Sequence, residues 1–170
     1  MIGEGLCPFA APVFDTLLIE VSDSDDLNQV TDDFLRLLER VAQADPQQLP
    51  TALLVMPQVL SEFDEYWNWV AICENLLSQL GHEGELQLAT FHPQYVFEGE
   101  DPDDPSNFSN RSPFPTLHII READIESALD NVPYPERIPE RNQRHLRRLG
   151  CQGILQIMPS LAPSRVVKSN

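Results

Sequence analysis

The sequence predicts an α/β fold, a single domain in which helices pack against a mixed β-sheet of four to five strands. Two observations predict this class. Short apolar runs alternate with longer stretches whose apolar residues recur every three or four positions, the β-α-β-α-β order typical of a parallel sheet. The third and fourth apolar runs are joined without a helical pattern, which favours an antiparallel pair.

The chain length of 170 residues suits one domain with one core. We expect that domain to cover residues 1–158, followed by a flexible tail over residues 159–170. A ferredoxin-like α+β arrangement is the main alternative, because a helix between the first two strands fits either topology.

The first half of the chain predicts two strands and two helices. Residues 14–21, FDTLLIEV, are rich in β-formers and predict the first strand, and residues 51–56, TALLVM, predict a second strand covered on both faces. Residues 25–44 and 61–80 carry helical apolar stripes. The stripes consist of Leu27, Val30, Phe34, Leu37 and Val41 in the first helix and Phe63, Tyr66, Trp67, Val70, Cys73, Leu77 and Leu80 in the second.

The second half begins with two strands around a long loop. Residues 85–91, ELQLATF, predict a third strand, and residues 116–121, TLHIIR, predict a fourth. The polar segment 92–115 between them is longer than most loops, and loops of that length are usually functional or disordered.

Beyond the fourth strand the pattern turns helical. We expect short helices over residues 124–132 and 139–149. The apolar run GILQIM at residues 153–158 predicts a fifth strand.

The net charge of −16 comes from 27 acidic and 11 basic residues and is unevenly distributed. Residues 1–110 carry 21 acids and two bases, whereas residues 111–170 carry nine bases and six acids. This charge argues against nucleic-acid and membrane partners, because phosphate groups would be repelled. Lys168 is the only lysine, so arginines must provide any anion binding.

The cysteines and the N-terminus favour a cytoplasmic protein. Cys7, Cys73 and Cys151 are far apart and form no CxxC pair, which fits free thiols in a reducing compartment. No signal-peptide pattern and no apolar run long enough to cross a membrane is present.

Polar residues gather where the predicted strands end. His92 follows the third strand, and Arg111 precedes the fourth, which carries His118. Ligands of open α/β sheets bind beyond the carboxyl ends of the parallel strands. We therefore expect the side chains of His92, Arg111 and His118 to line one pocket.

If this edge is an active site, His92 would act as acid or base, with Cys7 or His118 assisting, and Arg111 and Arg121 would hold an anion. Each residue also has a structural interpretation. His92 could hydrogen-bond the loop behind it, Cys7 could be a small buried side chain, and the arginines could pair with loop acids.

A metal site has little support. The loop acids lack the spacing of an EF-hand, and Cys7, His92 and His118 have no zinc-ligand spacing. We expect no metal, and no cofactor can be identified. Asp101, Asp103 and their neighbours fit a solvated face.

A basic segment lies near the C-terminus. Arg137, Arg141, Arg144 and Arg148 are spaced to share one helix face, with Arg147 and His145 nearby. This face could bind nucleic acid, or it could dock on the acidic part of the same chain or of a partner copy in a homo-oligomer. Electrostatics favour docking.

Four motifs together resemble one bacterial family, the domain of unknown function 1415 family. They are LCPFA at 6–10, FHPQYVFEG at 91–99, SNRSPFPTLHIIRE at 109–122 and IPERNQRHLRRLG at 138–150. The resemblance implies a small cytoplasmic α/β protein and brings no established activity. The positions that match the family's polar motif residues are Cys7, His92, Asn110, Arg111, His118, Arg121 and Asn142.

The resemblance adds two expectations. Asn110 and Asn142 join Arg111 and Arg121 as candidate ligand-binding residues. Members of the family usually have a helix ahead of the LCPFA motif, whereas six residues precede Cys7 here. Either that helix is missing or the start codon is assigned too late, and its loss would expose apolar surface.

Two function classes remain open. The first is a small enzyme, or a former enzyme, with a site for an anionic small molecule. The second is a ligand-binding or protein-interaction module without catalysis. The polar strand ends favour the first, and the absence of any complete catalytic motif favours the second.

Overall fold

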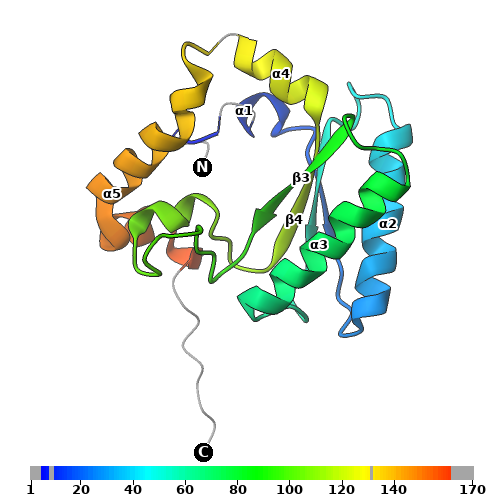
Figure 1. Ribbon diagram of the computed structural model, residues 1–170, viewed down its shortest axis with the longest axis horizontal. Helices are drawn as coiled ribbons and strands as arrows, with labels where there is room; N and C mark the ends of the chain where they lie inside the picture. Colours follow the sequence, from blue (N-terminus) through cyan, green and yellow to red (C-terminus); the bar gives the residue numbers. More distant parts are fainter. Residues whose placement is uncertain (1–4, 8–9, 131, 162–170) are drawn as a thin grey trace, which may run out of the picture.

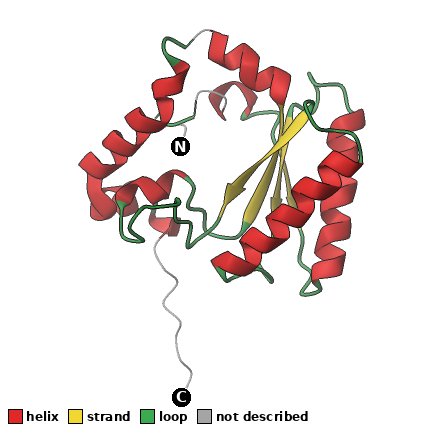
Figure 2. Ribbon diagram, in the orientation of Figure 1, coloured by secondary structure: helices red, strands yellow, loops and turns green. Residues whose placement is uncertain are grey.

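The computed structural model describes residues 5–7, 10–130 and 132–161 and shows a four-stranded sheet with helices on both sides (Figures 1 and 2). In chain order the elements are α1 (Ala10–Val13), β1 (Leu18–Val21), α2 (Leu27–Gln43), β2 (Thr51–Val55), α3 (Phe63–Gln79), β3 (Leu86–Phe91), η1 (Pro105–Ser109), β4 (Thr116–Arg121), α4 (Glu122–Asp130), η2 (Pro135–Arg137), α5 (Ile138–Ile157) and η3 (Pro159–Leu161), where η marks a 3₁₀ helix.

The sheet is mixed, as expected. Its order is β1-β2-β4-β3, in which β1 and β2 are parallel and β4 runs antiparallel to both of its neighbours. The ferredoxin-like alternative is wrong, because β1 and β2 pair directly instead of flanking another strand. The carboxyl ends of β1, β2 and β3 therefore lie at one edge, beside the start of β4.

The main core lies between the sheet and helices α2 and α3, which cover the same face (Figure 1). The apolar stripe of α2 buries Val30, Phe34 and Val41, and the Asp26 side chain caps the helix by accepting from the Asn28 N–H (2.9 Å). The amphipathic spacing read from the sequence thus forms this side of the core.

Tyr66 of α3 ties this helix to the strand ends. Its hydroxyl donates to the Thr116 carbonyl (2.8 Å) and accepts from the Phe91 N–H (3.2 Å). Burial raises the pKa of the phenol, which stays protonated as this bond requires. Tyr66 therefore fixes the distance between α3 and the edge where a site was expected.

A second apolar cluster lies outside the sheet. Leu6, Phe108, Leu146 and Ile154 join the N-terminal segment, η1 and α5. In Figure 1, α5 packs along η1 on the side of the molecule away from α2. The long loop and the last helix thus form one unit.

The predicted fifth strand is wrong. Residues 153–157 belong to α5, and the N–H of Met158, just after the helix end, bonds to the Ile154 carbonyl (2.8 Å). The kink at Gly150, with φ of 66° and ψ of 164°, redirects the helix so that Ile154 reaches the second cluster. When no neighbouring strand is available for pairing, an apolar segment can satisfy its backbone hydrogen bonds within itself by forming a helix.

Three boundaries also differ from the expectation. The first strand begins at Leu18, because Thr16 folds back and donates to the Val13 carbonyl through its N–H (3.1 Å) and its hydroxyl (3.2 Å). α4 begins at Glu122, directly after β4. In the expected tail, Pro159–Leu161 forms η3 and Leu161 packs on the second cluster, whereas residues 162–170 lie outside the described residues.

The long loop is held by side chains within it. Asn107 accepts from the Phe97 N–H (3.1 Å) and donates to the Asp101 carbonyl (2.8 Å), and Asp104 caps η1 at the Ser106 N–H (2.8 Å). In the described part of the chain, no helix has the length and apolar character needed to cross a membrane.

Candidate functional site

His92 lies on the helical side of the sheet, at the end of β3. Its ring is fully buried and stacks on Tyr66 with centroids 5.0 Å apart. Nδ1 accepts from the Gln94 N–H (3.1 Å), so Nε2 carries the proton and donates to the Leu60 carbonyl (2.9 Å). Burial lowers the pKa of His92 and keeps the ring neutral. Both nitrogens are used inside the fold, as in the structural interpretation.

His118 points to the opposite face of the sheet. Leu117 and Ile119 face the main core, so His118 alternates away from it and contacts Thr51 of β2 with Nε2 and Oγ1 2.6 Å apart. The Thr51 hydroxyl donates to the Ile119 carbonyl (2.7 Å), which makes His118 Nε2 the donor to Thr51. Burial lowers the pKa of His118 to about 4.

The arrangement expected at the strand ends is therefore wrong. His92 and His118 lie on opposite faces of the sheet, and Arg111 turns into the long loop, where Nε donates to the Tyr95 carbonyl (3.3 Å) and Nη2 to the Pro102 carbonyl (2.7 Å). Successive side chains of a strand point to opposite faces of the sheet. The position of His92 in this alternation falls on the face of the main core, and that of His118 falls on the other face.

Arg111 and Asn110 stabilise the loop. The Arg111 guanidinium lies 4.7 Å from the centroid of the Phe108 ring, and burial lowers its pKa. Asn110 donates from Nδ2 to the Thr90 carbonyl (3.0 Å). The structural interpretation had Arg111 pairing with loop carboxylates, but its described hydrogen bonds go to backbone carbonyls.

Arg121 is buried beneath α2. Its Nη2 donates to the carbonyls of Val41 and Ala44, the latter at 3.0 Å. These groups close α2, where a cation also stabilises the helix dipole. Arg121 is 6% exposed, so it lacks the access to solvent that an anion clamp needs.

Cys7 and Asn142 belong to the contact between the N-terminal segment and α5. Asn142 donates from Nδ2 to the Leu6 carbonyl (2.6 Å), next to the half-buried Cys7. None of the described contacts joins Cys7 to His92 or His118. Among the described residues no group of three or more His, Cys, Asp or Glu side chains could hold a metal.

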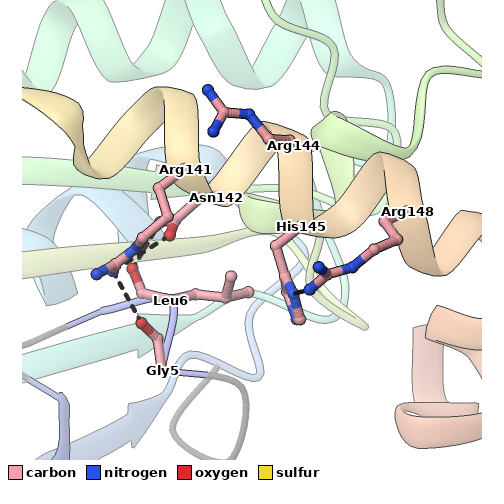
Figure 3. Close-up of a pocket in the computed structure, with 7 residues that line it drawn as sticks. All are labelled: Gly5, Leu6, Arg141, Asn142, Arg144, His145 and Arg148. Carbon is pink, nitrogen blue, oxygen red and sulfur yellow. Dashed lines mark hydrogen bonds between the residues drawn. The ribbon is translucent and has the colours of Figure 1, made fainter.

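An open pocket of about 440 Å³ lies where α5 meets the N-terminal segment (Figure 3). Its size lies in the range of small-molecule sites. We call it the α5 pocket. Its lining residues are Gly5, Leu6, Arg141, Asn142, Arg144, His145 and Arg148.

The basic side chains come from one face of α5. Residues three, four and seven positions apart stand above one another on a helix, so Arg141, Arg144, His145 and Arg148 line the same side. Arg141 donates to the Gly5 carbonyl (3.1 Å), Arg148 donates to His145 Nδ1 (2.9 Å), and Arg144 pairs with Glu140 (2.6 Å). The pocket therefore has an excess of positive charge.

Arg147 points from a different side of α5 toward the long loop. It contacts Asp104 through Nε (2.9 Å) and Glu100 through Nη2 (2.8 Å). Hydrogen bonding to Ser106 and contact with the Arg147 guanidinium lower the pKa of Asp104. Docking on the chain's own acids is thus confirmed for Arg147, whereas the shared face of Arg141, Arg144 and Arg148 lines the α5 pocket.

A second hollow, about 530 Å³ in volume, lies between α2 and the end of α3. Its acids are Asp32 and Glu39, and its base Arg36 pairs with Asp33. This hollow has no excess of positive charge, so the α5 pocket is the better candidate for an anion.

Sequence reasoning identified the basic face but missed the pocket. The spacing of Arg141, Arg144 and Arg148 gave the shared face, and the partner that completes the hollow is Gly5–Leu6, over 130 residues away in sequence. The LCPFA motif marked that segment without showing where it would pack.

The comparison with protein-family models agrees with the motifs. No curated protein and no solved structure matches the chain. A family model described as "Protein of unknown function (DUF1415)" matches residues 1–156, which is most of the sequence. The chain therefore belongs to the DUF1415 family.

Proposed function

We propose that this protein binds an anionic small molecule in the α5 pocket. One observation carries the proposal. In a chain with a net charge of −16, three of the 11 basic residues and one of the four histidines line a single pocket. Guanidinium groups bind carboxylates and phosphates through paired N–H donors, which makes arginine the usual residue for such a site.

The charge distribution supports a small anion over a polyanion. Charges on the surface are screened beyond about 8–10 Å at physiological ionic strength. A ligand within the pocket experiences mainly Arg141 and Arg148, whereas a nucleic acid or an anionic membrane spread over α5 would also meet the loop carboxylates beside it, among them Glu100 and Asp104. We therefore propose a small anionic metabolite as the ligand, and the free cysteines support a location in the bacterial cytoplasm.

The proposal concerns binding and assigns no reaction. Roles for His92, His118 and Cys7 in catalysis, and for Asn110, Arg111 and Arg121 in ligand binding, stay predictions from the sequence. The hydrogen bonds of His92, Arg111 and Arg121 support structural roles for these three residues. Asn142 lines the pocket and holds its wall through Leu6.

Calorimetric titration with phosphate, citrate and suberate tests the proposal. We expect at least one of them to bind, and Arg148→Gln to weaken that binding about three- to tenfold. Arg40→Gln is the matched control, since it removes one positive charge from an exposed position on α2. If Arg40→Gln and Arg148→Gln have equal effects, or if no anion binds, the proposal is wrong.

A second candidate function, protein interaction, is favoured by the sheet face opposite α2 and α3. By strand alternation this face carries Leu53, Val55 and Ile120, together with Ile19 and Val21, which are 58% and 51% exposed. Exposed apolar surface of this kind often marks an interface, including one between two copies of a chain. Light scattering across a concentration series would test association, and Ile19→Glu should abolish it.

A further inference from the structure

We infer that the α5 pocket selects an extended dianion, a molecule with an acidic group at each end of an uncharged spacer. The inference rests on the proposed function and specifies its ligand class. It follows from how the positive charges are divided within the pocket.

One positive end is formed by Arg141. Its guanidinium donates to the Gly5 carbonyl (3.1 Å), and this bond holds the side chain against the N-terminal segment. Figure 3 shows the Arg141 guanidinium at the Gly5 end of the pocket, away from His145. An acidic group bound here would meet one guanidinium.

The other positive end is formed by Arg148. Arg148 Nη2 donates to His145 Nδ1 (2.9 Å), which draws the two side chains together. Arg141 and Arg148 are seven positions apart, and a helix rises about 1.5 Å per residue, so their backbones stand about 10 Å apart. Figure 3 shows the two guanidinium groups at opposite ends of the pocket, so a compact anion engages one of them.

Between the two ends, the described lining residues carry no uncompensated charge. Figure 3 shows the Leu6 side chain extending between the two ends, and it shows Arg144 directed away from Leu6. Arg144 pairs with Glu140 (2.6 Å), so its charge is compensated. Leu6 is only 4% exposed and its carbonyl accepts from Asn142, so an uncharged spacer would cross this stretch without desolvating a charge.

These three features distinguish ligand shapes. Phosphate or another compact anion can engage one end and gains the attraction of that end alone. A dianion long enough to span the pocket engages both ends. We expect affinity to depend on the length of the ligand as well as on its charge.

The test is a calorimetric titration with the linear dicarboxylates succinate, adipate, suberate and sebacate, with monomethyl suberate as a monoanion of matched length. We expect affinity to rise along the series to suberate or sebacate, and the half-ester to bind about tenfold more weakly than suberate. Arg141→Gln and Arg148→Gln should each reduce that preference for suberate to less than about twofold, because each removes one end of the site. Arg40→Gln should preserve the preference, and circular dichroism confirms that each variant is folded.

The outcomes separate the inference from the proposed function. If anions bind but succinate, suberate and the half-ester bind equally, the extended dianion is wrong and anion binding stands. The same holds if Arg148→Gln weakens binding whereas Arg141→Gln does not. If none of these anions binds, both the inference and the proposed function are wrong.

Discussion

Replacing His92 with alanine is expected to lower the free energy of unfolding by about 3–5 kcal/mol. The ring bonds the Leu60 carbonyl and the Gln94 N–H, and a buried polar group that loses its partner costs about 1–3 kcal/mol. Loss of the aromatic contacts with Tyr66 and Phe63 adds about 0.5–1.5 kcal/mol. Water entering the space left by the ring offsets part of the total.

The measurement is urea unfolding followed by tryptophan fluorescence and by circular dichroism. His82→Ala is the matched control, because the only described hydrogen bond of the His82 side chain is to the exposed Glu85, and its loss should cost less than about 0.5 kcal/mol. If His92→Ala lies within about 1 kcal/mol of the unaltered protein, His92 does not hold the strand ends together and the structural role assigned to it is wrong.

Three further predictions concern the rest of the fold. Between pH 6.5 and about 4 the unfolding free energy should fall by up to about 3 kcal/mol on account of His118, because its folded pKa is lowered and the unfolded chain binds the proton first. Urea titrations across this range should show a smaller loss for His118→Gln, and an unchanged pH dependence would contradict the buried, neutral ring. Arg121→Ala should cost about 2–4 kcal/mol in the same assay, since it leaves carbonyls of α2 without partners; a neutral effect would show that solvent replaces the guanidinium. Gly150→Ala should cost about 1–3 kcal/mol, because φ of 66° with ψ of 164° is strained for any side chain, whereas Gly153→Ala, in ordinary helical backbone, should be neutral or stabilising; equal effects on the melting temperature would refute the kink.

Local patterns in the sequence were enough to predict most of the sheet and the two helices that cover it. Val30, Phe34 and Val41 recur at helical spacing, so one face of α2 packs against the core. Thr51–Val55 is a mostly apolar segment, as expected for a strand covered on both faces. The antiparallel pairing of β3 with β4 followed from a connection without a helix. These features depend on neighbours close in sequence.

The predictions that were wrong concern features that depend on contacts between residues distant in sequence. The run at 153–158 is as apolar as a strand, and its helical state is decided by packing of Ile154 on Leu6 and Phe108. To predict on which face of the sheet His92 and His118 lie, one must know the register of β3 against β4. In that register Ala89, and not His92, is paired with His118. A shift of the strand register by one residue moves each side chain to the opposite face of the sheet, and the amino-acid composition does not determine the register.

The central claim is that anions bind in the α5 pocket and not where the strands end. The most direct measurement is a two-dimensional ¹H–¹⁵N NMR titration of the assigned protein with suberate. We expect chemical-shift changes to concentrate on the amides of Gly5, Leu6 and residues 141–148. Changes concentrated on residues 90–95 and 109–118, with those of the α5 pocket unmoved, would contradict the claim.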